Sequence, residues 1–500
     1  MKIIIVGGGT AGWLTAAIIA AQHNGHLPGA PELVLVESEN VPTIGVGEGT
    51  WPTMRNTLSS IGLKECDVFK RCNAAFKQGG KFVNWVNGNN DYYYHPFTVP
   101  TGYGRIDLAP YLSDITNFAT LTNFQQDVCE AGLAPRTLAE QEYQGSCNYG
   151  YHLDAAAFGV LLKEKCINDF GVTHIVDDVK RVAVSPNGEI MGLTLENQGE
   201  ISGELYIDCS GMHSILLGKA LNVPMVDVSA VLFNDRALAV QVPYPSDAAP
   251  LASHTIATAQ NAGWIWDIGL TSRRGVGHVY SSRYLSDDEA ESNLRRYIGD
   301  AMNTLTPRKI EFNSGYRAEF WKNNCVAVGM AAGFVEPLEA TAIMLVELSA
   351  RYIADNLIPD SAATRVIAKR FNEQMHYRWQ RIIDFLKLHY MLTKRQEQYW
   401  KDHTNPETIP DSLKDDLAIW HCRGPRVEDF KSAYELFPAA SYQYVIYGMG
   451  FKPEFEKQEY LYQRKNEVES ILRRTQQLTT QLLQNLPPHR EYIAKWLSQH

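Results

Sequence analysis

The 500-residue sequence predicts an α/β fold that combines a buried parallel sheet, a mixed β module and a helical C-terminal part. Three observations support this prediction. A β-branched strand at residues 2–6 runs directly into a glycine-rich turn and a helix. Short apolar strands at residues 205–208 and 325–329 end in small-residue turns, and the second is expected to lead into a helix from about Pro337. From about Thr364 the apolar residues recur at helical spacing instead.

The first strand is followed by glycines with the G-x-G-x-x-G spacing of a dinucleotide-binding turn. In such a turn the first glycine permits the tight bend, the second lets the backbone approach a pyrophosphate, and the third lets the next helix pack closely. That helix is expected over residues 11–21, with its N-terminal N–H groups holding the phosphates. The predicted cofactor contacts here are Gly7, Gly9, Thr10, Ala11 and Gly12.

A second apolar strand at residues 33–36 ends at Glu37, where an acidic residue is suited to bind a ribose hydroxyl. Two other interpretations are a chance cluster of glycines and an N-terminal signal peptide. The strand, helix and acid that accompany the glycines argue against chance. The glycines also interrupt the apolar run that a signal peptide needs.

The identity of the dinucleotide is indicated further along the chain. The late strands, with Asp208 at the end of one and Gly329 after the other, resemble those of FAD proteins of the glutathione-reductase type, in which a late turn approaches the flavin. The glycines of loop 45–50, which contains Gly47 and Glu48, would let the backbone press against the flavin ring. A second G-x-G-x-x-G for NAD(P)H is absent from the sequence. FAD is therefore favoured over NAD, with reduced flavin supplied by a separate reductase.

Composition narrows the class of protein further. The net charge of −10 argues against nucleic acid or an anionic membrane as partner. Eight cysteines without a C-x-x-C pair indicate a reduced, cytoplasmic protein, and the histidines show no metal-ligand spacing. The longest apolar stretch, 341–357, contains Glu347, Arg351 and Asp355, so a buried helix is expected there instead of a membrane span.

The predicted FAD-binding part is discontinuous, and other modules lie between its segments. Residues 86–104 are expected to form a loop because turn formers and aromatics dominate them. An apolar stripe over residues 466–486 is typical of core or of subunit contact, so a homo-oligomer remains open. The predicted division is FAD-binding segments 1–85, 151–225 and 316–360, a pocket-shaping insertion 86–150, a β-rich substrate module 226–315 and a helical substrate-capping region 361–500.

Four segments, IIIVGGGTAGW, AAFKQGGKFVNW, AGWIWDIGL and FVEPLEATA, occur in this order along the chain. Together they resemble flavin-dependent halogenases of the tryptophan-halogenase type, and the resemblance covers essentially the whole sequence. It implies that FADH2 and O2 give a flavin hydroperoxide, which halide attacks to form hypohalous acid. The oxidant would then reach a lysine beside an aromatic substrate.

The resemblance assigns this lysine to Lys77 and an acid to Glu339. An amine can hydrogen-bond hypohalous acid or form a haloamine, and a nearby carboxylate can accept the proton that the substrate ring loses. Glu336 competes for the second role, but the match falls on the later acid. Without the resemblance, Lys77 would be read as a solvated charge and both acids as helix N-terminal residues.

The tryptophan motif of the family appears as Trp264 and Trp266, which would face the same side of a strand and separate flavin from substrate. Core packing is the alternative interpretation. Gly269 stands where the family has proline, and a glycine is expected to loosen the backbone there.

The family's halide pattern, F-x-x-P-x-x-S-x-G, has Ala340 and Ala342 in place of its serine and glycine. Thr341 and the backbone N–H groups, including that of Ala342, are left as halide donors. Because chloride is the most strongly hydrated of the three candidate halides, a preference for bromide or iodide is expected.

The substrate is indicated by His95 and Phe97, which match a family H-x-F segment, and by Tyr442. The family has two adjacent tyrosines at the last position, whereas Gln443 follows here. An indole- or phenol-like aromatic is therefore expected in place of free tryptophan. The alternatives are a flavin monooxygenase that hydroxylates an aromatic and a non-catalytic flavin-binding redox sensor.

Overall fold

The computed structural model describes residues 1–23, 27–41, 47–358 and 361–500 and divides into two compact units. Both units mix helices and strands, which confirms the predicted α/β class. The roles assigned above to six sequence segments stay a prediction. Unit 1 comprises Met1–Ala74, Leu153–Val228 and Phe312–Trp379, and unit 2 comprises Ala75–His152, Ser229–Glu311 and Gln380–His500.

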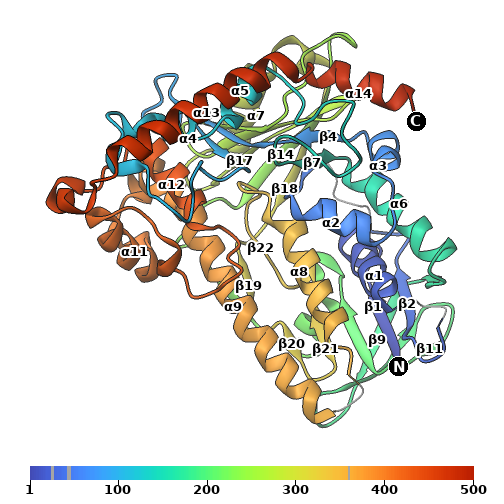
Figure 1. Cartoon of the computed structure of the whole chain (residues 1–500). Helices are drawn as coiled ribbons and strands as arrows, with labels where there is room; N and C mark the ends of the chain where they lie inside the picture. Colours follow the sequence, from blue (N-terminus) through green and yellow to red (C-terminus); the bar gives the residue numbers. More distant parts are fainter. Residues whose placement is uncertain (24–26, 42–46, 359–360) are drawn as a thin grey trace. The chain divides into compact units, whose positions relative to one another are not determined.

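Unit 1 is built on a six-stranded sheet in which only the edge strand β20 runs antiparallel to its neighbour (Figure 1). Ile3, Ile4 and Ile5 of the central strand β1 are fully buried, as expected for a parallel strand covered on both faces. The strand order is β20 (Trp321–Lys322), β21 (Cys325–Ala327), β12 (Leu205–Asp208), β1 (Lys2–Val6), β2 (Glu32–Glu37) and β8 (Thr173–Val176).

Helix α1 (Thr10–His23) confirms the helix predicted after the glycine-rich turn and packs against α6 (Ala155–Asn168) and α8 (Thr341–Asp355). Two three-stranded sheets, the two-residue strand β3 and two short helices complete the regular elements described in this unit, apart from single helical turns. They are β11 (Glu200–Ile201), β10 (Ile190–Leu195) and β9 (Val179–Val184); β13 (Met225–Asp227), β19 (Gly315–Arg317) and β22 (Gly333–Phe334); β3 (Glu48–Gly49); and α2 (Thr53–Ser60) and α3 (Glu65–Arg71).

Helix α8 begins later than the sequence suggested. A helix was expected from about Pro337, but Pro337 opens a turn in which the Ala340 N–H donates to its carbonyl at 3.2 Å. Ala340 then adopts a left-handed conformation, so the helix cannot begin before Thr341. The helix carries the long apolar stretch, and within the described ranges no helix is long and apolar enough to cross a membrane.

Unit 2 contains a seven-stranded sheet in the order β18 (Arg308–Glu311), β14 (Arg236–Pro243), β17 (Arg273–Tyr280), β16 (Trp264–Gly269), β15 (Thr255–Ala259), β5 (Gly79–Val83) and β6 (Tyr92–Pro96). Strand β6 corrects the prediction of a loop at 86–104. The turn formers lie on either side of it, whereas Tyr93 and Tyr94 are buried and β6 pairs with β5. Beside this sheet, β4 (Ala75–Lys77) pairs with β7 (Gly150–Leu153).

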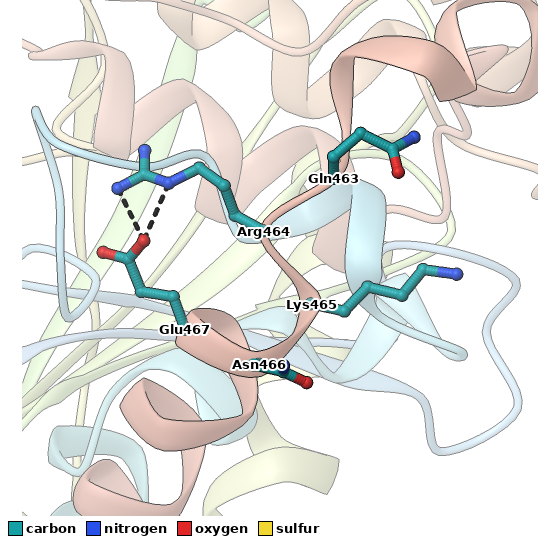
Figure 2. A pocket seen from close by; sticks show the side chains of 5 residues that line it. All are labelled: Gln463, Arg464, Lys465, Asn466 and Glu467. Carbon is teal, nitrogen blue, oxygen red and sulfur yellow. Dashed lines mark hydrogen bonds and ion pairs between the residues drawn. The ribbon is translucent and has the colours of Figure 1, made fainter.

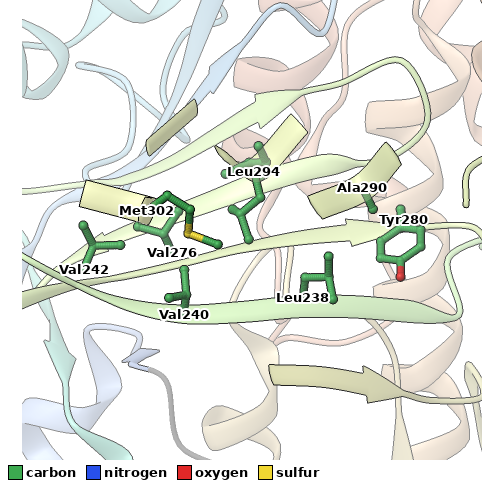
Figure 3. Close-up of a cluster of buried hydrophobic side chains, with 9 residues drawn as sticks. Leu238, Val240, Val242, Val276, Tyr280, Ala290, Leu294 and Met302 are labelled. Carbon is green, nitrogen blue, oxygen red and sulfur yellow. The ribbon is translucent and has the colours of Figure 1, made fainter. Parts of the chain in front are cut away.

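Part of the unit 2 core lies between the sheet and α7 (Asp287–Ile298), where alternate residues of β14 and β17 face the helix (Figure 3). Ser286 and Glu289 form a reciprocal capping box that fixes the start of α7. This packing confirms the β-rich character predicted for residues 226–315. The cluster comprises Leu238, Val240, Val242, Ile265, Val276, Tyr280, Ala290, Leu294 and Met302.

The predicted helical C-terminal part is confirmed. Val468, Ile471 and Leu482 of the expected apolar stripe on α13 are buried, but Leu478 is 39% exposed. Leu478 was expected on the stripe, and it is exposed because α13 packs into one apolar cluster near its start and another near its end. The helices of this part are α9 (Ser361–Met391), which belongs to unit 1 up to Trp379, and α10 (Gln398–His403), α11 (Asp411–Cys422), α12 (Ala439–Gly448), α13 (Lys465–Asn485) and α14 (His489–Ser498) of unit 2, which also contains α4 (Phe118–Thr122) and α5 (Gln125–Glu130).

Candidate active site

The three glycines of the first turn have three different surroundings in unit 1. Gly7 has φ +120°, and a Cβ there would lie 2.2 Å from the Cys209 carbonyl oxygen. A Cβ on Gly12 would lie 1.9 Å from the Gly7 oxygen, so only glycine allows α1 to pack this closely. At Gly9, by contrast, no atom of the described chain lies within 4 Å of such a Cβ. The open space above Gly9, at the N-terminus of α1, fits the pyrophosphate of a dinucleotide.

Glu37 lies against the same turn, since a Cβ on Gly8 would approach its Oε2 to 1.8 Å. Its Oε1 is 2.7 Å from the Lys163 Nζ and 3.2 Å from the His174 Nε2, and Trp13 donates its indole N–H to Oε2 at 3.2 Å. The carboxylate is therefore held against the glycine-rich turn by Lys163, His174 and Trp13, and its contact with a ribose hydroxyl stays a prediction. No sequence signal connected Lys163 or His174 to this acid.

The late turn at Gly329 lies against the glycine-rich turn, and its predicted approach to the flavin stays a prediction. Gly329 has φ +69°, and a Cβ on it would lie 2.8 Å from the Cβ of Ala11. Within the expected flavin loop 45–50, Gly47 has φ 122° and leads into Glu48 and Gly49, which form the short strand β3 instead of a loop. Gly45 and Val46 of the expected flavin loop lie outside the described residues.

Asp208 was predicted to contact the cofactor, but its carboxylate is bound by the chain itself. It is fully buried, and its Oδ2 accepts the N–H groups of Leu216 and Leu217 at 3.0 and 2.8 Å. Its Oδ1 accepts the Ser210 hydroxyl at 2.5 Å. Since both oxygens are occupied by the following turn, Asp208 shapes that turn and has no free lone pair aimed outward.

The turn before α8 brings together the predicted acid and halide residues. Glu336 and Glu339 are 1% and 7% exposed. Thr341 is buried, whereas Ala342 is exposed. The first backbone N–H groups of α8 have no acceptor within the helix, which makes this helix end suited to an anion. The sequence did not reveal one contact of this turn. Trp51 donates its indole N–H to the Glu339 carbonyl at 2.9 Å.

Lys77 is the last residue of β4 in unit 2, opposite Gly150 on β7. Only 4% of Lys77 is exposed, and its Nζ lies 5.1 Å from the centre of the Phe97 ring. A buried ammonium over an aromatic face is stabilised by the ring's charge distribution. The structure therefore brings two predicted site residues together and shows that Lys77 is not a solvated surface charge.

Neutral histidines hold the strand that carries Lys77. The Phe76 N–H donates to the His489 Nε2 at 3.1 Å, and the His489 Nδ1 donates to the Leu251 carbonyl at 3.0 Å. Burial lowers the pKa of His489 to about 4, so the ring is uncharged at neutral pH. Burial, and then the charge of Lys77, hold the pKa of His152 well below its ordinary value. Lys77 therefore has an ordered support that adds no positive charge.

The predicted substrate residues of unit 2 are all largely buried. His95, at the end of β6, packs edge-to-face on Phe385 at 5.5 Å between ring centres. Tyr442 is fully buried, and its hydroxyl accepts a hydrogen bond from the Arg381 Nη2 at 2.8 Å. Because that bond belongs to a buried ion network with Asp384 and Asp416, the structure places Tyr442 in the interior instead of on a pocket wall.

Trp264 and Trp266 lie on the same face of β16 with ring centres 6.4 Å apart, which confirms the predicted strand geometry. Gly269 does not loosen the strand as expected. It still pairs with Arg274, and a Cβ there would lie 2.8 Å from the Leu251 Cδ1. A larger residue at this position would displace the ends of the Leu251 and Tyr244 side chains, so the glycine lies in a closely packed part of the strand.

A hollow on the surface of unit 2 is lined by consecutive residues at the start of α13, Gln463, Arg464, Lys465, Asn466 and Glu467 (Figure 2). The Arg464 Nε donates to the Glu467 carboxylate at 2.7 Å, so that charge is already paired. None of the predicted site residues lines it. Within the described residues, no group of three His, Cys, Asp or Glu side chains is placed to hold a metal ion.

Comparisons with known proteins extend over the entire chain. The family model for tryptophan halogenase matches residues 2–464. The 7-chloro-L-tryptophan 6-halogenase KtzR of Kutzneria sp. (strain 744) is 33% identical, with 99% of each chain covered. The crystal structure of a tryptophan halogenase from Shewanella frigidimarina superposes with a TM-score of 0.95 at 46% identity, covering 100% of this chain and 98% of the other. Tar14, a tryptophan C-6 chlorinase from taromycin biosynthesis, gives 0.92 at 33% identity, with 99% of each chain covered.

Proposed function

Since the chain belongs to the tryptophan halogenase family, and is therefore a flavin-dependent halogenase of an aromatic substrate, we propose that Lys77 delivers the halogen to that substrate. Bound reduced flavin, supplied by a separate reductase, would provide hypohalous acid from O2 and halide. Gly7, Gly9 and Gly12 would hold its pyrophosphate and Glu37 its adenosine ribose. The observation that carries the proposal is the buried amine of Lys77 over the Phe97 ring.

The chemistry of Lys77 follows from its surroundings. As an ammonium it can donate a hydrogen bond to hypohalous acid and so make the halogen more electrophilic. As an amine it can form a haloamine, in which a nitrogen–halogen bond replaces a nitrogen–hydrogen bond and water leaves. Burial excludes bulk water from either species, which protects the oxidant from side reactions.

We expect Glu339→Gln to slow halogenation by about 10²- to 10⁴-fold, the usual contribution of a positioned acid–base group. The carboxylate would accept the proton that the ring carbon loses after the halogen adds. Single-turnover rates with preformed hypohalous acid would isolate this step from flavin chemistry. Glu336→Gln is the matched control, since both acids are buried in the same turn. A larger loss from Glu336→Gln would move the acid to that residue.

The substrate is proposed to be an indole- or phenol-like aromatic in place of free tryptophan. KtzR and Tar14 are named for tryptophan substrates. In this chain, however, the second tyrosine of the family pair is Gln443, and the Tyr442 hydroxyl is already bound by Arg381. Both differences remove groups that could hold an amino-acid moiety.

Product analysis with reduced FAD, air, three halides and a panel of tryptophan, indole and phenol would test the whole proposal. Halogenated indole or phenol with little halotryptophan is expected. Hydroxylated products would favour the monooxygenase instead, and flavin oxidation without any aromatic product would favour the redox sensor.

We also propose that bromide or iodide is used more efficiently than chloride, although Tar14 shows that a related fold supports chlorination. With alanine at 340 and 342, a hydroxyl donor is missing. A hydrogen bond to an ion is worth roughly 1.5–3 kcal/mol, or about 10- to 150-fold in binding, and chloride depends on it most. We expect the double change Ala340→Ser with Ala342→Gly to raise the ratio of chlorinated to brominated product. A ratio unchanged in competition assays would show that these positions do not set the preference.

A further inference from the structure

We propose that Trp51 is a positioning residue that fixes the carboxylate of Glu339 through its backbone. The inference rests on the proposed role of Glu339 and adds to it a residue outside the four family segments. Trp51 lies immediately before α2, in a part of the sequence that offered no reason to connect it with the acid.

The contact is a single directed hydrogen bond within unit 1. The indole N–H of Trp51 donates to the Glu339 carbonyl at 2.9 Å. An indole has one donor and no acceptor, so this geometry specifies which backbone group it meets. Glu339 is 7% exposed, which leaves little water to replace that donor.

The turn that holds Glu339 needs an external support. Ala340 has φ 54° and ψ 43°, the left-handed region that a residue with a Cβ enters only under constraint. It is also the N-cap of α8, and its methyl group offers no capping hydrogen bond. Within the turn the Ala340 N–H donates to the Pro337 carbonyl at 3.2 Å. The bond from Trp51 acts on the peptide group between Glu339 and Ala340, which is the group that a relaxation of Ala340 would rotate.

The segment that contains Trp51 is also bonded to α8, the helix that follows the turn. Two helical turns beyond Glu339, Glu347 accepts the hydroxyl of Thr53 at 3.2 Å and also that of Thr57. Arg351 donates to the Thr57 hydroxyl at 2.7 Å. The start of α2 is thus tied to α8 at a second place, so Trp51 and Glu339 are held in fixed register.

The position of the Glu339 carboxylate matters because the halogenated ring loses its proton to this group in one step. The ring C–H bond breaks, its electron pair restores aromaticity, and the proton passes to the Glu339 carboxylate. A displacement of about 1 Å can lower such a rate by about 10²-fold. Loss of the Trp51 hydrogen bond should therefore lower kcat and leave substrate binding nearly unchanged.

Trp51→Phe keeps an aromatic ring and removes the donor, and we expect it to lower kcat about 10- to 100-fold. The KM for the arene and the dissociation constant for FAD should stay within about twofold of the wild-type values. Trp321→Phe is the matched control, because Trp321 donates to the Asn323 carbonyl at 3.2 Å at the sheet edge. It should retain wild-type kcat.

A double-mutant cycle distinguishes positioning from general structural damage. In a Glu339→Gln background, Trp51→Phe should cause almost no further loss, since Trp51 acts through the acid. Wild-type kcat for Trp51→Phe, or a full additional loss in the Glu339→Gln background, would overturn the proposal. Wild-type activity of Glu339→Gln alone would instead overturn the proposed role of the acid. If Trp51→Phe does not fold, benzothienylalanine at position 51 removes only the N–H and should give the same loss of kcat.

Discussion

Lys77→Ala is expected to abolish halogenated product, a loss of at least about 10³-fold. Reduced flavin should still be oxidised by O2, because Lys77 acts on hypohalous acid after that acid has formed. FAD binding should also remain, since the cofactor turn and Glu37 belong to unit 1 and Lys77 to unit 2. Product chromatography, flavin reoxidation followed by absorbance, and FAD titration would measure the three quantities separately.

Lys81→Ala provides the control for the loss of a lysine in the same region. Lys81 lies on β5 and pairs with Glu130, and it is absent from the proposed chemistry. We expect this variant to keep its halogenating activity. Near-wild-type halogenation by Lys77→Ala would remove the lysine from the mechanism, whereas loss of flavin reoxidation in that variant would assign Lys77 an earlier role.

The cofactor turn could be predicted from sequence because its chemistry is local. The strand, the glycines and the following helix occupy neighbouring positions, so their spacing predicts the turn, although the atom that excludes a Cβ from Gly7 comes from the distant Cys209. The same locality explains why β16 and its two tryptophans were anticipated. Residue spacing alone determines which side of a strand they face.

The surroundings of the site could not be predicted because they depend on residues far apart in the chain. Phe76 meets His489 across 413 positions, and Trp51 meets Glu339 across 288. Neither pair has a spacing motif. Such contacts form only when the sheets and helices have packed, and a single sequence carries no record of them.

Polar residues were the least predictable part of the site for a related reason. Asp208 and Tyr442 have side chains that could bind a ligand, and sequence position suggested that they do. In the structure a turn occupies the oxygens of Asp208, and Arg381 occupies the hydroxyl of Tyr442. Whether a polar group is free to bind a ligand is decided by its tertiary partners.

Gly9→Val is expected to remove FAD binding without unfolding the protein. The space beside Gly9 is empty of atoms from the described chain, so a larger side chain meets no protein there. It would instead fill the volume that the pyrophosphate needs and block backbone N–H groups from the phosphates. Loss of two charge-assisted hydrogen bonds at roughly 2 kcal/mol each corresponds to about 10³-fold in affinity. Halogenation should then be undetectable at ordinary FAD concentrations.

FAD fluorescence titration and thermal unfolding together test this expectation. Gly9→Val should lose affinity with an apo melting temperature close to that of the wild type. Gly12→Val provides the contrast, because its Cβ would lie 1.9 Å from the Gly7 oxygen and should destabilise the fold itself. Wild-type FAD affinity in Gly9→Val would place the dinucleotide elsewhere. A melting temperature as low as that of Gly12→Val would show that Gly9 serves packing instead of leaving space for the cofactor.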